Sequence, residues 1–521
     1  KINHIYVISS FISAYRFIET ERRKAMDIEK EYSCLERNCK VYQKCIDMDE
    51  DYQEALPQYC DDIYRVVKCV SRTYITSMDT NYNEVKLFGK TEICITYFNE
   101  SSCLCYADFE EEFTKLIDID NISESAFANA VVNNKYTNFR VINQRRIDIH
   151  ASSAVNVCVY DKIKCPCISS CDNSKLKIET QKTASVINTN ICRAEFDEEF
   201  SVPGDSKPIK RIISSSSFVT LGETKIIKDK ALIKAVVSLA VLYTTDEEEE
   251  QLLKCEYSFN ISKIIDVTGI DDDDIIISNL SVGNIFFKAK SASNDKLCVI
   301  EAFGDVLINS TFIREREEEL VTDGYVLNHK SDCSYSDFSC SRNGRQISDT
   351  KMQNISFDLS AEVTEIKELN ITLSESYVRN GKIISKAAAN AMCMTTAGSL
   401  ATFSSTSDLE IEIENCQSAI SALTLRSYDY TMQSNGKVDV RLSIGLFAYI
   451  YEETNIRILS EINADDDEIK YPTLTVYFGK QNESIWSIAK SFSSDIDLII
   501  SENDLNSEIL DSNKILIIPG V

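Results

Sequence analysis

Apolar residues recur with a period of two in several stretches of the chain. The clearest case runs from Val438 to Leu446, where every second residue is Val, Leu or Ile. This alternation predicts β-strands with one buried face and one solvent-facing face, as in antiparallel sheets. Two further strand-like runs flank the turn-like sequence Lys228-Asp229-Lys230 inside the central stretch Val202–Ile313. We therefore expect a mainly β protein.

The central stretch has a second copy earlier in the chain. Val85–Tyr97 aligns with Ala231–Tyr243 without a gap, and Phe113–Asp118 aligns with Ile261–Asp266. Internal repeats are a stronger guide to architecture than local patterns. Further along, residues 145–160 correspond to residues 295–311.

A third, more divergent copy follows. Its opening strands fall at Leu369–Met394, its middle strand at Asp408–Ile413 and its closing strand at Gly436–Glu453. The sequence thus predicts three tandem β-sandwich-like modules.

The boundaries of these modules follow from the prolines and from polar segments. Pro57, Pro203 and Pro208 precede copies one and two, and the segment Ser331–Thr350 is rich in Ser, Asp, Asn and Gly. Proline is excluded from central strands, and such polar segments are typical of loops. We expect modules at 56–165, 195–325 and 355–465, separated by linkers at 166–194 and 326–354.

Residues 1–55 are expected to be helical or irregular. Apolar residues recur at helical spacing from Ile8 to Ile18, before the charged run Glu19–Lys30. This segment does not resemble a secretion signal, because Arg16 and several serines interrupt its apolar part.

The period changes again in the tail, residues 470–521. A strand at Leu474–Phe478 is followed by a helix from about Ser484, a second helix from Ser494 or Asp495, and a strand at Ile515–Ile518. This order predicts a small βααβ unit. Trp486, the only tryptophan in the chain, is expected to fill its core.

Composition excludes several classes of protein. The chain of 521 residues carries 82 acids against 55 bases, a formal net charge of −27. Nucleic-acid binding needs clustered Lys and Arg, so we expect no nucleic-acid partner. No run approaches the roughly 20 apolar residues that span a bilayer, so we expect no membrane span. The acid runs are interpreted as solvated loops.

The 19 cysteines are interpreted mainly as small buried apolar residues. Zinc was weighed at Cys165-Pro166-Cys167 with Cys171, and at Cys103-Leu104-Cys105. Neither has the paired spacing of a zinc ribbon, and we expect no metal and no cofactor. The alternative role for these thiols is crosslinking between copies in an assembled shell.

No enzyme motif is present, and no residue is assigned as catalytic. Gly89-Lys90-Thr91 looks like the end of a phosphate-binding loop, but residue 84 is Glu where that motif requires Gly. Paired carboxylates occur by chance among so many acids. We therefore expect a protein that is not an enzyme.

The tail resembles a LysM domain, a small module that binds peptidoglycan and chitin. The resemblance lies in residues 482–490 (NESIWSIAK), Asn503 and the closing segment 515–519 (ILIIP). It implies a shallow groove for glycan that contains N-acetylglucosamine. The residues carried over to that groove are Asn482, Glu483, Ser484 and Ile485 on one wall and Ile509, Leu510 and Asp511 on the other.

The repeats resemble the SPOCS domain of clostridial spore-coat and spore-morphogenesis proteins. The resemblance lies in residues 202–212 (VPGDSKPIKRI), 236–243 (VVSLAVLY), 262–267 (SKIIDV) and 319–325 (ELVTDGY). Copy one shows it in residues 56–69 (LPQYCDDIYRVVKC) and 145–151 (RRIDIHA). Three such modules before a LysM domain imply a non-enzymatic structural protein.

Such a protein would be made in the mother cell and built into the spore envelope, coat or spore surface. Its expected partners are itself, other spore-coat proteins and peptidoglycan. The alternatives are a subunit of a spore-surface filament or appendage and, in another class, a peptidoglycan-acting enzyme that its LysM domain targets.

Overall fold

The protein is almost entirely β-structure in a computed structural model of the chain. The model describes residues 28–202, 208–246, 250–291, 297–359, 362–433, 436–469, 472 and 474–520. Within these residues there are 21 strands and two short helices. The expectation of a mainly β protein is confirmed. The helix expected between Ile8 and Ile18 lies outside the described residues.

Unit 1 is a sandwich of two three-stranded antiparallel sheets. One sheet has the order β1-β6-β5 and the other the order β2-β3-β4. The strands are β1 (Lys30–Ala55), β2 (Arg65–Asn81), β3 (Glu84–Phe98), β4 (Leu104–Asp118), β5 (Phe127–Asn143) and β6 (Arg146–Cys171).

Unit 2 repeats this arrangement with the next six strands. The sheet β10-β9-β8 packs against strands ordered β11-β12-β7, which belong to a longer six-stranded sheet. The strands are β7 (Ser174–Ser201), β8 (Ile209–Ile227), β9 (Lys230–Thr245), β10 (Leu252–Asp266), β11 (Ile275–Ser291) and β12 (Leu297–Val326).

Unit 3 is a variant of the same plan. Its strands β13, β19 and β18 complete the six-stranded sheet, and β16 is the centre of the opposite sheet. The strands are β13 (His329–Asp358), β14 (Val363–Leu373), β15 (Tyr377–Arg379), β16 (Lys382–Thr395), β17 (Leu400–Glu412), β18 (Ser418–Met432) and β19 (Lys437–Glu468).

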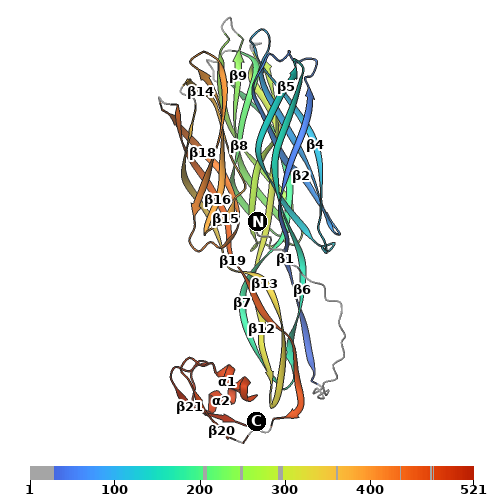
Figure 1. Ribbon diagram of the computed structural model, residues 1–521, viewed down its shortest axis with the longest axis vertical. Helices are drawn as coiled ribbons and strands as arrows, with labels where there is room; N and C mark the ends of the chain where they lie inside the picture. Colours follow the sequence, from blue (N-terminus) through green and yellow to red (C-terminus); the bar gives the residue numbers. More distant parts are fainter. Residues whose placement is uncertain are drawn as a thin grey trace.

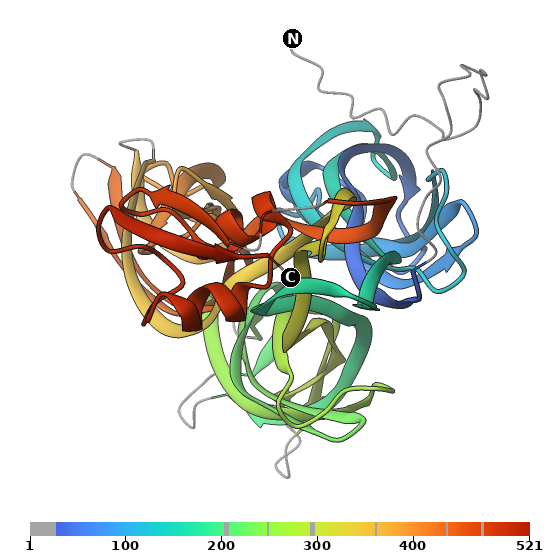
Figure 2. The same ribbon diagram turned by 90° about the horizontal axis from the view of Figure 1, so that it is seen from below.

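The three units form three lobes around a common axis above a narrow stalk (Figures 1 and 2). The stalk consists of the extended ends of three antiparallel strand pairs, β1 with β6, β7 with β12, and β13 with β19. These ends are residues 30–40, 160–171, 174–186, 314–326, 329–342 and 454–468. A small tail, residues 474–519, lies at the tip of the stalk.

The stalk corrects three sequence-based expectations. Residues 30–55, expected to be helical or irregular, form β1. The expected linkers at 166–194 and 326–354 are, apart from the turns at 172–173 and 327–328, strands that run from the stalk into the lobes. Along the chain, consecutive units are connected by two-residue turns that contain Asn173 and Asn328. Both residues have positive φ, a conformation that Asn tolerates better than most residues.

The residues aligned in the sequence repeat occupy equivalent places in the first two units. β3 and β9 are each the centre of a three-stranded sheet, and Val85 pairs with Ile117 just as Ala231 pairs with Ile265. The strands also end alike, with Tyr97 and Tyr243 fully buried. The same alternation of apolar positions therefore builds the same half-sandwich twice.

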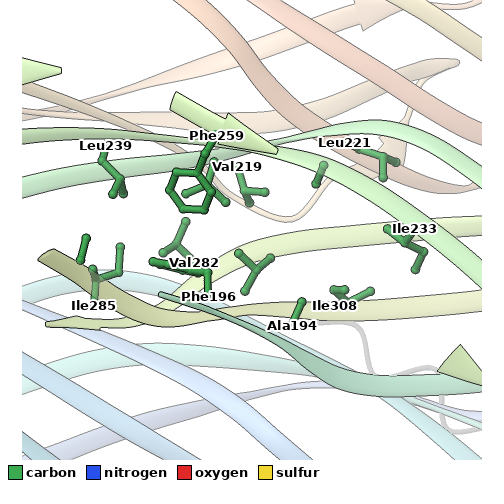
Figure 3. Close-up of a cluster of buried hydrophobic side chains, with 14 of the residues drawn as sticks. Ala194, Phe196, Val219, Leu221, Ile233, Leu239, Phe259, Val282, Ile285 and Ile308 are labelled. Carbon is green, nitrogen blue, oxygen red and sulfur yellow. The ribbon is translucent and has the colours of Figure 1, made fainter. Parts of the chain in front are cut away.

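The core of unit 2 lies between its two sheets (Figure 3). Val219, Leu221, Ile233, Leu239 and Phe259 of β8–β10 face side chains of the opposite sheet. Those labelled in the figure are Ala194, Phe196, Val282, Ile285 and Ile308. Burying each large side chain contributes about 1.5–3 kcal/mol, so the apolar alternation stabilises each lobe separately.

A further core joins all three units. Two buried residues from each unit meet there: Val67 and Leu104, Ile213 and Leu242, Met392 and Leu400. A second shared cluster in the stalk includes Leu320, Phe338 and Ile456. The units therefore pack side by side around a common interior, and they are not independent domains connected by linkers.

Candidate functional site: the tail at the tip of the stalk

The tail has the expected order of strand, helix, helix and strand. It consists of β20 (Leu474–Gly479), α1 (Ile485–Phe492), α2 (Ile496–Glu502) and β21 (Lys514–Pro519), and β20 pairs antiparallel with β21. Ser484 and Asp495 are the N-cap residues, as expected, although only Asp495 caps its helix with its side chain, at Asp497 N. Asn503 fastens α2 to β21 through hydrogen bonds with Ile499 and Ile517.

The structure brings together the two segments predicted as groove walls. The amide of Asn482 donates to the carbonyl of Leu510 at 2.8 Å, and the amide of Leu510 donates to the carbonyl of Glu483 at 2.9 Å. A β-bridge also joins Ser484 and Ile509. The two walls are therefore held against each other by backbone hydrogen bonds.

The predicted glycan-binding residues divide into buried and accessible ones. Ile485 and Leu510 belong to the tail core, so their side chains do not face a surface ligand. Asn482, Ile509 and Asp511 are exposed, and Glu483 and Ser484 are partly exposed.

Local hydrogen bonding explains the roles of Asn482 and Glu483. Asn482 has a φ of 66°, the conformation for which Gly is most often used and which Asn tolerates. The carboxylate of Glu483 accepts hydrogen bonds from Lys480 N and from the Tyr477 hydroxyl, and these lower its pKa. Glu483 thus fixes the loop and stays ionised at neutral pH.

Trp486 differs from its predicted role as the plug of the tail core. It is only partly buried, and it contacts the stalk edge-on at Tyr325 with 5.2 Å between ring centroids. Its indole N–H donates to Asp323 Oδ2 at 2.9 Å. The buried centre of the tail is formed instead by the aliphatic residues Ile485, Ile488, Ala489, Ile499, Leu510, Leu516 and Ile518. Trp486 is therefore a docking residue.

Several polar contacts complete the junction of tail and stalk. Asp323 also contacts Lys490, and it accepts a hydrogen bond from the Tyr335 hydroxyl. These donors hold the pKa of Asp323 below its usual value although burial opposes this. On the other side, Lys175 lies 2.9 Å from Asp495 and 2.7 Å from Asp497.

Sequence reasoning missed this junction. Asp323 and Tyr325 lie in the segment ELVTDGY, which resembles the SPOCS domain but has no pattern that predicts a contact with the tail. A lone tryptophan in a domain of about fifty residues gives no indication of which neighbour it contacts.

We expect Trp486→Phe to weaken the docking of the tail by about 1.5–3 kcal/mol, the usual contribution of a hydrogen bond to a charged group. The ring still packs on Tyr325, but Asp323 loses one of its donors. Limited proteolysis of the full chain should then release the tail faster. Tyr477→Phe, which removes a hydrogen bond to Glu483 inside the tail, should leave the release rate unchanged. Equal protection of wild type and Trp486→Phe would contradict the docking role.

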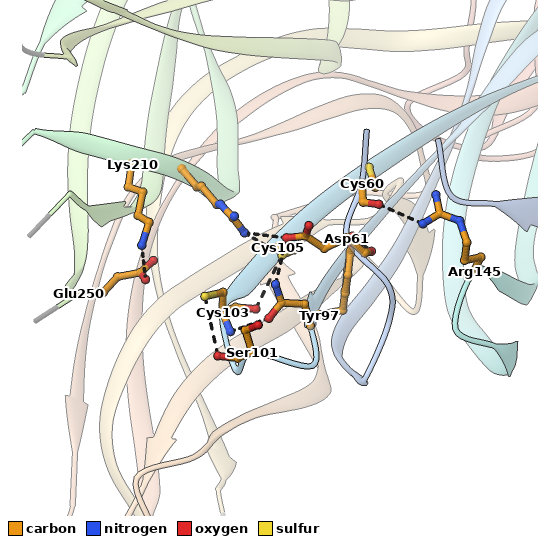
Figure 4. Close-up of polar contacts among 11 residues, drawn as sticks. Cys60, Asp61, Tyr97, Ser101, Cys103, Cys105, Arg145, Lys210 and Glu250 are labelled. Carbon is orange, nitrogen blue, oxygen red and sulfur yellow. Dashed lines mark hydrogen bonds and ion pairs between the residues drawn. The ribbon is translucent and has the colours of Figure 1, made fainter. Parts of the chain in front are cut away.

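A second polar cluster joins units 1 and 2 at the end away from the stalk (Figure 4). The Cys105 thiol donates to Asp61 at 3.4 Å, and Arg211 donates to both Cys105 Sγ and Asp61. Burial raises the pKa of Cys105 to about 11. This thiol is therefore protonated at neutral pH and lacks the thiolate that nucleophilic chemistry requires.

The other residues of candidate motifs have structural roles in the fold. Cys165 and Cys167 are buried in the stalk beside Phe338, where they act as small apolar side chains. Gly89 lies in the middle of β3, where a Cβ would collide with the Phe113 ring. Among the described residues, no group of three or more His, Cys, Asp or Glu side chains is placed to hold a metal ion. The described helices are also too short to cross a membrane.

Comparison with known proteins gives one match. The family described as SipL, SPOCS domain, matches residues 208–290, which run from the start of β8 almost to the end of β11. No curated protein and no solved structure matches the chain. The family match indicates a protein related to sporulation.

Proposed function

We propose that this protein is a non-enzymatic structural component of the bacterial endospore envelope, in the coat or at the spore surface. It would be made in the mother-cell cytoplasm and then built into that layer. The similarity of residues 208–290 to the SPOCS domain supports the link to sporulation. The repeated strand plan supports the view that units 1 and 3 are divergent copies of the same domain.

The observation that carries the structural role is the shared interior of the three units. A core to which all three units contribute, together with a stalk of three strand pairs, makes a rigid body with several exposed sheet edges. The side chains with shifted pKa values belong to contacts inside this body. Desolvation raises the pKa of the Cys69 and Cys94 thiols to about 12, so both are protonated at neutral pH, and Glu375 lies between units 1 and 3. An assembly role therefore fits better than catalysis.

Self-association is proposed to use the sheet edges of the lobes. β4 is an edge strand, and it carries the exposed run Glu110–Glu112 at its middle. Charges on an edge discourage pairing with another chain, and salt screens them over about 8 Å at physiological ionic strength. We expect particle size in sedimentation experiments to rise with salt. A protein that remains monomeric at all salt and protein concentrations would contradict self-assembly, and docking of other coat proteins would then remain.

Crosslinking between copies, if it occurs, should use Cys34 and Cys45. Both are exposed on β1, whereas burial raises the pKa of Cys69 and Cys94 to about 12 and suppresses their reactivity. We expect Cys34→Ser/Cys45→Ser to remove any oligomer that reductant dissociates on a non-reducing gel. Cys69→Ser is the matched control and should leave that oligomer intact. Crosslinks that survive the double substitution would contradict this assignment.

The tail is proposed to contact peptidoglycan, or a partner protein, through the exposed part of the segment pair 482–485 and 509–511. We expect the purified full chain to sediment with insoluble peptidoglycan without releasing soluble muropeptides. Asp511→Ala/Ile509→Ser should reduce retention, because both side chains are exposed beside Asn482. Release of muropeptides would support the alternative of a peptidoglycan-acting enzyme. Unchanged retention of the double variant would place the contact elsewhere.

Filament formation is the second structural candidate. A narrow stalk with a terminal domain below a broad three-lobed head is a shape suited to stacking head to tail. Electron microscopy of the purified protein distinguishes a filament from a sheet or shell.

A further inference from the structure

A groove of about 380 Å³ lies on the stalk beside the docked tail. This volume is within the range of ligand pockets in proteins. Residues of four stalk strands and Trp486 of the tail line it. The stalk residues among them include Lys177, Glu179, Asp323, Tyr335, Arg342 and Arg457.

The groove lies where two neighbouring strands separate. β7 and β13 pair only at Ala184 with Ser341 and at Thr183 with Arg342. Toward the stalk tip, residues 174–182 of β7 pair with β12 alone, and residues 329–340 of β13 pair with β19 alone, among the residues that the structure describes. Two strand edges without a partner therefore flank the groove. Such edges accept an additional extended chain.

The groove also carries uncompensated positive charge. Lys177 is paired with Glu179 at 2.8 Å, and Lys490 is paired with Asp323. Neither Arg342 nor Arg457 forms an ion pair within the described part of the chain. In a chain of net charge −27, two such guanidinium groups beside one groove favour an anionic occupant.

The spacing of the two arginines indicates an elongated occupant. In the β-ladder, Arg457 lies opposite Asp337, which is five residues from Arg342 along β13, or roughly 17 Å of strand. The aromatic rings are already engaged, since the Arg457 guanidinium lies 3.7 Å from the centroid of Tyr335 and Trp486 contacts Tyr325. An extended peptide can in addition bond to the strand edges, which a sugar ring cannot do.

We propose that this groove binds an extended acidic peptide segment of a partner protein. Carboxylates of the peptide pair with Arg342 and Arg457, and its backbone bonds to the free edge of β7 or β13. This site is separate from the surface at residues 482–485 and 509–511, so it does not depend on glycan binding by the tail.

The test uses the full chain and its single tryptophan. The probe is a ten-residue peptide of alternating threonine and glutamate, and the control peptide replaces each glutamate with glutamine. We expect the acidic peptide to change the Trp486 emission saturably and to release heat in titration calorimetry. The control peptide should do neither. Absence of binding by both methods would overturn the proposal.

Substitutions locate the binding. Arg342→Gln and Arg457→Gln should each weaken the affinity about tenfold, as expected for the loss of one charged contact. Arg140→Gln removes an exposed arginine of β5 in unit 1 and should leave the affinity unchanged. Equal affinity of all variants would overturn the proposal. So would an acidic oligosaccharide such as oligogalacturonate that binds more tightly than the peptide with the same dependence on both arginines.

Discussion

Glu368→Ala is expected to lower the free energy of unfolding by about 3–5 kcal/mol, the usual effect of breaking a buried ion pair. Glu368 Oε1 lies 2.8 Å from Lys68 Nζ, and the two side chains are only 4% and 12% exposed. Lys68 also donates to Ser214 Oγ at 3.0 Å. The pair thus joins units 1 and 3 and reaches unit 2. Without Glu368, an ammonium group remains in this shared interior without its counter-ion.

The loss of stability in Glu368→Ala comes from the unpaired charge of Lys68, so removing both charges should restore stability. We expect Lys68→Met/Glu368→Leu to unfold within about 1–2 kcal/mol of wild type, because apolar replacements of a buried pair are often neutral or stabilising. Glu223→Ala, which breaks an exposed pair with Lys234, should leave the free energy of unfolding nearly unchanged. Chemical denaturation of the four proteins checks these values. A small loss of stability for Glu368→Ala would contradict this expectation and show that the interface rearranges around Lys68 when Glu368 is absent.

Glu375→Gln is expected to stabilise the protein above neutral pH, by up to about 3 kcal/mol. Glu375 enters unit 1 from the loop between β14 and β15, where Asn156 donates to Oε1 at 3.2 Å and Asn133 to Oε2 at 3.4 Å. Burial raises its pKa to about 7, although the two asparagines oppose the shift. The difference from the ordinary pKa of 4.5 corresponds to about 3 kcal/mol.

The pH dependence of stability follows from the raised pKa of Glu375. Because the pKa of Glu375 is higher in the folded protein, the folded state binds this proton more tightly. The stabilising contribution is complete below about pH 4.5 and is lost as the pH rises to about 7. Gln mimics the neutral acid, so wild type and Glu375→Gln should differ little at pH 4.5 and most at pH 8.

Denaturation midpoints at both pH values measure this effect. Glu124→Gln, at an exposed position of unit 1, is the control and should show no such difference between the two pH values. A Glu375→Gln protein that is less stable than wild type at pH 8 would mean that the carboxylate is favoured in its ionised form.

The candidate site was predictable in its local parts only. The helix starts at Ser484 and Asp495 are local features that the sequence indicated, whereas the pairing of segments 482–485 and 509–511 was implied only by the resemblance to a LysM domain. The burial of Ile485 and Leu510 depends on how the helices pack on β20 and β21. The docking of Trp486 on Asp323 depends on a contact between residues 163 positions apart, for which no local pattern exists.

The stalk illustrates why composition misled the assignment of linkers. Residues 331–350 are rich in Ser and Asp, which is typical of loops. In the structure this segment belongs to β13, where Phe338 and Cys340 face the stalk core while most neighbouring side chains are partly or fully exposed. A strand that buries only a few side chains needs few apolar residues. Its backbone N–H and C=O groups form hydrogen bonds with β19. The sequence of β13 alone does not specify this pairing.

The sequence by itself determined the repeated strands of the lobes and the βααβ order of the tail. These features depend on alternation and spacing, which the chain carries locally. Tertiary structure alone decided that the three units share one interior, that their ends pair into a stalk and that the tail docks at its tip. Those contacts join residues hundreds of positions apart, such as Lys68 and Glu368. Their stability depends on complementary surfaces and paired charges, which become defined only when the folded units meet.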